Sequence, residues 1–132
     1  MTYINELTED RLQEYIRQQE FQMYLQPQYS ITGNTIVGAE ALARWKHHGA
    51  FISPAEFIPV LEQRGLIAQL DSYIWECAFA LQAQKQQEGI ALVPISVNVS
   101  REDFSEIDVY QTLTDLSRRY DVSPAFIHIE IT

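Results

Sequence analysis

The chain has 132 residues, of which 46% are hydrophobic and 20% are charged, and 18 acidic against 9 basic residues give a net charge of −9. These values exclude a disordered or fibrous chain and are typical of one globular domain with its own core. The negative charge would repel both a nucleic-acid polymer and an anionic membrane surface, so neither is expected as a partner, whereas metal cations remain compatible.

Cysteine content and hydropathy bear on the compartment. Cys77 is the single cysteine, so an internal disulfide and a four-cysteine zinc site are both excluded. The sequence has no apolar run of membrane-spanning length and no signal-peptide pattern at its start. We therefore expect a cytoplasmic protein.

The first part of the chain predicts a helix and then a hairpin. Thr8 is a suitable N-cap for a segment in which apolar residues recur at helical spacing. Alternating apolar and polar residues predict a strand over 21–26, and a second extended run covers 35–45. The turn residues 32–34 make the connection so short that the two strands must be antiparallel.

The rest of the chain alternates helices with strands. Ser53 and Pro54 predict a helix start, but Pro59 in the same stretch favours two short turns over one smooth helix. The further expected elements are a helix over about 71–88, a strand over 91–99, a capping pair at Ser100 and Asp103, a helix over 109–120 and a strand over 126–132. This order predicts an α/β fold with a mostly parallel sheet.

Each predicted strand has one apolar and one polar face, because successive side chains point to opposite sides. The polar faces carry Gln26, Glu40, Arg44, Asn98 and Glu130. They meet either water, as in helices layered on a sheet, or one another inside a closing barrel, near the carboxyl ends of its strands. In the barrel, Glu40, Asn98 and Glu130 would offer hard oxygen ligands for Mg²⁺, Mn²⁺ or Ca²⁺. Periodicity alone does not choose between the two arrangements.

Five segments, in this order, resemble the motifs of one bacterial family. They are Tyr24-Leu25-Gln26-Pro27, the run 37–45 with Glu40-Ala41-Leu42 inside it, the run 53–59, Val97-Asn98-Val99-Ser100 and Ile129-Glu130-Ile131-Thr132. Together they resemble EAL domains, phosphodiesterases that linearise the second messenger cyclic di-GMP. The match extends from about Leu7 to Thr132. The resemblance therefore implies that residues 1–132 are the amino-terminal half of an EAL domain, with 1–6 as a lead-in.

The resemblance also implies a fold and a site. The fold is α/β, a partial TIM-like (β/α) barrel with an antiparallel first strand and about four of the eight strands. Three metal ligands of the family match Glu40, Asn98 and Glu130. The resemblance also implies that Glu40 is the catalytic residue. Positions that hold the dinucleotide match Gln26, Leu42 and Arg44, and a glutamate beside the site matches Glu62. Mg²⁺ or Mn²⁺ would neutralise the phosphodiester and polarise the attacking water.

About half of such a barrel is missing from the chain. A TIM barrel typically has about 250 residues and eight strands, and the family's later acidic motif and lysine are not in this sequence. We therefore predict little or no hydrolysis of cyclic di-GMP by this chain alone. Its last strand would leave an open sheet edge, so we expect either a fragment of a longer protein or self-association through that edge.

Two other functions stay open. A non-catalytic regulatory module could bind cyclic di-GMP or a protein partner without hydrolysis, and a structural half-barrel would only assemble with itself.

Several side chains have simpler interpretations. His128 shares a face with Glu130 but is interpreted as a structural histidine, and at least one of His47 and His48 is expected to face solvent. Trp45 and Trp75 are expected in the core.

Overall fold

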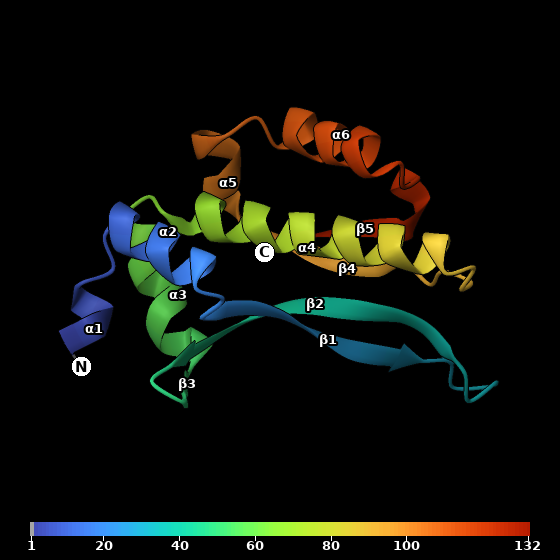
Figure 1. Cartoon of the computed structure of the whole chain (residues 1–132), viewed down its shortest axis with the longest axis horizontal. Coiled ribbons are helices and arrows are strands. Elements are labelled where there is room, and N and C mark those ends of the chain that lie inside the picture. Colours follow the sequence, from blue (N-terminus) through green and yellow to red (C-terminus); the bar gives the residue numbers. More distant parts are fainter. Residues whose placement is uncertain (1) are drawn as a thin grey trace.

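The computed structural model describes residues 2–132, which form one sheet with helices packed against its apolar face. Figure 1 shows α4 lying along the sheet, with α6 on the side of α4 away from the β1–β2 hairpin. In chain order the elements are α1 (Thr2–Asn5), α2 (Glu9–Arg17), β1 (Phe21–Tyr29), β2 (Ile36–His47), β3 (Ala50–Ile52), α3 (Pro54–Gln63), α4 (Ile67–Gln87), β4 (Ile95–Val99), α5 (Arg101–Glu106), α6 (Val109–Tyr120), the 3₁₀ turn η1 (Pro124–Phe126) and β5 (Ile127–Ile131).

The sheet has the order β1-β2-β4-β5, and β3 pairs with β2 outside that path. β1 is antiparallel to β2, whereas β2, β4 and β5 are parallel to one another. This confirms the predicted α/β fold with an antiparallel first strand. The four strands of the main path are those that the sequence predicted.

Helix starts follow the predicted capping residues. Thr8 accepts a hydrogen bond from the N–H of Arg11 at 3.3 Å, and Ser53 accepts one from the N–H of Ala55 at 3.2 Å. A side-chain oxygen at these positions satisfies an N–H that the helix itself leaves unpaired.

The prediction of two short turns around Pro59 was wrong, because α3 is one helix. A proline inside a helix removes one hydrogen bond to the carbonyl four residues earlier. Pro59 is exposed, so water can replace that bond. Phe57 and Leu61, on either side of it, are fully buried and hold both halves of α3 against the core.

Other boundaries also differ from the predicted ones. α4 starts at Ile67, four residues early, because Ile67 and Leu70 continue its buried stripe. β4 starts only at Ile95: Pro94 has no N–H to donate, although its carbonyl accepts a hydrogen bond from Ala39 at 3.0 Å. The short strand β3 was not predicted from the sequence.

The core lies between the apolar face of the sheet and helices α3, α4 and α6. Trp45 of β2 and Trp75 of α4 are both fully buried, as predicted. None of the helices within residues 2–132 has the length and hydropathy that crossing a membrane requires.

Candidate functional site

The register of the sheet places the predicted site residues on one face. Gln26 lies opposite Glu40, Glu40 opposite Ser96, and Asn98 opposite Glu130. Paired residues of neighbouring strands point to the same side of the sheet, and so does every second residue along one strand. The residues that share this polar face, away from the core, are therefore Gln26, Glu40, Leu42, Arg44, Asn98 and Glu130.

A cavity of about 290 Å³ opens where β2 and β4 separate. The two strands pair only at Ala39 with Ile95 and at Glu40 with Ser96. Beyond these pairs, residues of α3 and α4 line the gap between the strands. Four predicted site residues line this cavity, namely Leu42, Arg44, Glu62 and Asn98. Gln26, Glu40 and Glu130 lie outside the lining, so the structure brings only part of the predicted site together.

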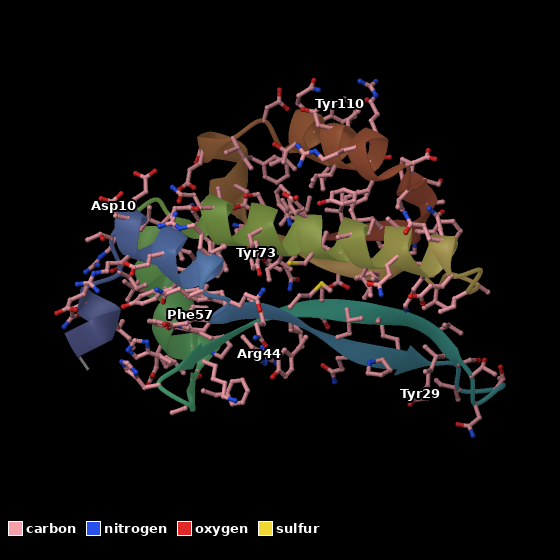
Figure 2. The ribbon with its side chains drawn as sticks, in the orientation of Figure 1. Asp10, Tyr29, Arg44, Phe57, Tyr73 and Tyr110 are labelled. Atoms are coloured by element: carbon pink, nitrogen blue, oxygen red, sulfur yellow. The ribbon has the colours of Figure 1, made fainter. Side chains whose placement is uncertain are left out.

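Arg44 is the cationic side chain in the lining of this cavity. One of its guanidinium N–H groups donates to the carbonyl of Ala43 at 2.9 Å. Figure 2 shows Arg44 on the side of the hairpin away from α4, the helix that carries Tyr73. The ion pairs found within residues 2–132 join His47 to Glu20 and Arg119 to Glu76. Neither of these ion pairs includes Arg44.

Asn98 is held in place through its backbone. Its carbonyl accepts a hydrogen bond of 3.0 Å from the indole N–H of Trp75, and the next carbonyl, that of Val99, accepts one from Thr132 at 3.0 Å. Helix α4 and strand β5 therefore both fix the strand at the position from which Asn98 projects.

The sequence did not predict a carboxyl pair formed by half-buried Asp71, which lines the same cavity as Asn98, and buried Asp103. Asp103 is fully buried and accepts a hydrogen bond from the N–H of Ser100 at 2.8 Å, as the predicted cap requires. Asp71 accepts one from the Ser100 hydroxyl at 2.7 Å. Burial, and then the neighbouring Asp103, raise the pKa of Asp71 to about 8. The sequence signal was an aspartate on a buried stripe, one turn from Ile67 and Trp75.

The remaining titratable candidates differ in their surroundings. Partial burial and the nearby Glu102 raise the pKa of Glu62 above its ordinary value. His48 is exposed, as predicted for one of the pair, and His47 contacts Glu20 at 2.8 Å. His128 is exposed on the polar face, which does not support its interpretation as a structural histidine.

The donor types on this face fit a hard divalent cation, because all three predicted ligands offer oxygen. Asn98 and Glu130 lie directly opposite each other on neighbouring strands, which are typically about 4.8 Å apart. Glu40 on β2 pairs with Ser96, two residues before Asn98. No group of three or more His, Cys, Asp or Glu side chains suited to a metal ion occurs in the described part of the chain. A metal site here therefore remains a proposal.

Comparison with known proteins identifies the family. The EAL domain model matches residues 9–132. The probable cyclic di-GMP phosphodiesterase PdeB of Escherichia coli is 34% identical over 128 residues, which are 92% of this chain and 24% of that protein. The cyclic di-GMP phosphodiesterase PA2567 of Pseudomonas aeruginosa is 31% identical over 113 residues, 85% of this chain and 19% of that protein.

Solved structures agree with the fold. The PaMucR phosphodiesterase, solved as a c-di-GMP complex, superposes with a TM-score of 0.82 at 24% identity, covering 91% of this chain and 49% of that one. The FimX EAL domain of Xanthomonas citri, also in complex with c-di-GMP, gives 0.78 at 19% identity, over 92% and 47%. The chain thus spans about half of these domains and a quarter or less of the two curated relatives. On the family match and its fold, this chain belongs to the EAL domain family.

Proposed function

We propose that this chain is the cation- and dinucleotide-binding half of a cyclic di-GMP phosphodiesterase of the EAL type. One observation carries the proposal: the sheet register puts Glu40, Asn98 and Glu130 on the same face as Gln26, Leu42 and Arg44. The relatives PdeB and PA2567 are named cyclic di-GMP phosphodiesterases, one of them as probable, which supports the substrate class.

Arg44 is the proposed phosphate contact. A guanidinium presents several N–H donors in one plane, which matches two oxygens of a phosphate better than a point charge does. Gln26 is proposed to hold the dinucleotide with its amide and Leu42 with an apolar contact, since both project from the same face as Arg44. Glu62 lines the cavity beside Arg44.

Glu40, Asn98 and Glu130 are the proposed ligands of Mg²⁺ or Mn²⁺, with Glu40 as the catalytic residue. The bound ions would supply neutralisation of the phosphodiester charge and polarisation of a water. The protein's own contribution is placement: Trp75 and Thr132 fix the β4 backbone on which Asn98 projects.

We further propose that residues 1–132 are the amino-terminal half of the domain, inactive alone, in a cytoplasmic protein, and able to self-associate through the open sheet edge. The alternative is a regulatory module that binds cyclic di-GMP or a protein without hydrolysis. The observation that favours it is that Leu42 and Arg44 line the cavity, whereas two of the three proposed metal ligands, Glu40 and Glu130, are not in its lining.

Titration calorimetry of cyclic di-GMP into the chain with Mn²⁺ tests this function. Arg44→Ala should weaken binding by about tenfold to a hundredfold, because a charge-assisted hydrogen bond to phosphate is lost. Arg17→Ala is the matched control, since Arg17 is exposed at the end of α2 and should leave binding unchanged. Glu40→Ala should remove the dependence on Mn²⁺.

Chromatography of the products completes the test. Linear dinucleotide that disappears with Glu40→Ala would overturn the inactivity of this half-domain. Binding that needs Arg44 but neither Mn²⁺ nor Glu40 would favour the regulatory module. No binding of the dinucleotide by the folded chain would overturn both functions.

A further inference from the structure

Two aromatic side chains lie on the polar face of the sheet. Tyr24 of β1 pairs with Leu42. Phe51 of β3 pairs with Lys46, two residues after Arg44. Both rings therefore project from the face that carries Arg44. The rings meet edge to face, with their centroids 5.9 Å apart and their planes at 85°, yet Tyr24 is 44% and Phe51 is 56% exposed. Adjacent aromatic rings with this exposure are typical of a binding surface.

The two rings line a hollow of about 430 Å³ on this face, together with Arg44, Ile52, Ser53 and Pro54. We call it the aromatic hollow. Its lining residues all lie between 24 and 54, on β1, β2, β3 and the start of α3. Arg44 and Pro54 also line the cavity of about 290 Å³ that has Asn98 in its wall. Arg44 is therefore shared by two neighbouring hollows.

Positive charge gathers at the aromatic hollow, although the chain as a whole has a net charge of −9. Arg44 lies in the lining, and the Lys46 ammonium is 5.5 Å from the centroid of the Phe51 ring. Among residues 2–132, no acidic side chain belongs to the lining. Aromatic rings beside cations match a ligand that combines a flat π system with negative charge. A nucleotide has both, in its base and its phosphate, so it is the ligand class that this chemistry favours.

We propose that the aromatic hollow binds one purine base of the cyclic dinucleotide, while Arg44 holds the phosphate next to that base. This inference rests on the proposed function, because it uses the same ligand and the same phosphate contact. Each phosphate of cyclic di-GMP links two nucleosides, so a phosphate on Arg44 brings a base to the aromatic hollow. Tyr24 and Phe51 then contact the substrate without taking part in the chemistry of the phosphodiester.

The perpendicular rings form a corner that suits a flat base. A base that stacks parallel to one ring meets the other ring edge to face, and the ring quadrupoles favour both arrangements. Stacking needs only the π face that every base has, so the aromatic hollow contributes affinity without distinguishing guanine from adenine. A purely structural pair, which ties β1 to β3 across β2, would contribute stability but no affinity.

Titration calorimetry of cyclic di-GMP into the chain with Mn²⁺ measures the contribution of the Phe51 ring. Phe51→Ala and Phe51→Leu should both weaken binding by about fivefold to a hundredfold, because stacking on the base is lost. Phe51→Tyr should retain the wild-type affinity, because it keeps the ring. Tyr29→Ala is the matched control, since Tyr29 is a 60% exposed aromatic residue of β1 outside the aromatic hollow. Urea unfolding checks that each variant is folded.

A second measurement does not depend on cyclic di-GMP. In NMR spectra without metal, GMP should shift the ring signals of Tyr24 and Phe51. Ribose 5-phosphate, which has the phosphate but no base, should leave these signals in place. If the wild-type chain binds no cyclic di-GMP, the proposed function fails and the GMP titration alone decides whether the aromatic hollow binds a base.

Three results would each overturn the proposal. The first is that GMP leaves the ring signals of Tyr24 and Phe51 unmoved, and the second is that ribose 5-phosphate moves them as far as GMP does. The third is wild-type affinity for cyclic di-GMP in Phe51→Ala or Phe51→Leu while Arg44→Ala binds weakly. This third result would leave the proposed function standing and remove the base from the aromatic hollow.

Discussion

Asp71 is an acid on the buried side of α4, and the pKa of its carboxyl is raised from 3.8 to about 8 by burial first and then by Asp103. Between about pH 4 and pH 8 the Asp71 carboxyl therefore stays protonated in the folded chain, whereas in the unfolded chain it has lost its proton. Stability contributed by such a group is fully present at acid pH and falls as pH rises from about 4 toward 8. At neutral pH the protonated Asp71 can donate to the Asp103 carboxylate, one oxygen of which has no other hydrogen-bond partner among residues 2–132.

Asp71→Asn should raise the free energy of unfolding at neutral and alkaline pH by about 1–3 kcal/mol. The asparagine amide can donate to Asp103 and its carbonyl can accept from Ser100 without any bound proton. The stability lost between acid pH and about pH 8 should shrink as well. Urea unfolding over that pH range measures both effects.

Asp115→Asn is the control for that measurement, because it makes the same substitution at an exposed position on α6. It should leave the pH dependence unchanged. An Asp71→Asn variant with the wild-type pH dependence would show that Asp71 is not the protonated partner.

Elements differ in how far the sequence predicted them. The polar faces of the strands were predicted because they depend only on the alternation of side chains along a strand. The caps at Thr8 and Ser53 were predicted because each depends on residues within one helical turn. The strand β3 was missed because its turn needs His48 and Gly49 both at positive φ, 48° and 80°, and histidine is not a usual signal for that. The Asp71–Asp103 pair depends on packing between α4 and α5, which local pattern does not contain.

Gln82 shows how α4 holds two strands at once. It is fully buried, and its amide donates to the carbonyls of Val93 at 2.8 Å and Phe126 at 3.0 Å. These carbonyls come just before β4 and β5, so one side chain fixes the start of both parallel strands. A buried carbonyl left without a donor costs about 1–3 kcal/mol.

Gln82→Leu should therefore lower the free energy of unfolding by about 2–4 kcal/mol, because the half-buried carbonyls of Val93 and Phe126 both lose their donor. Chemical denaturation measures the change. Gln84→Leu, on the exposed side of the same helix, should change stability little. Equal effects of the two substitutions would mean that helix propensity, and not the tie between β4 and β5, decides the result.

Across the whole molecule, burial is uneven along the sheet. Val97 and Val99 in the central strand β4 are fully buried, and so are Phe21 and Trp45, which pair at one end of the hairpin. At its other end Tyr29 is mostly exposed and leads into a loop that is exposed over nearly all of its length. Gln26 and Glu40 pair between these two ends, so the proposed dinucleotide face extends into the less buried part of the sheet.

Native-state hydrogen exchange should follow this gradient. Amides of β4 should exchange only on global unfolding, because opening them exposes the core, whereas amides near Tyr29 should exchange through local opening with a much smaller free energy. Residue-resolved exchange by NMR measures both in one sample, and the paired amides near Phe21 and Trp45 provide the matched control within the same hairpin. Equally slow exchange at Tyr29 and at β4 would show that the hairpin opens only with the core. The proposed Gln26 contact would then rest on a rigid strand rather than on one that a ligand must order.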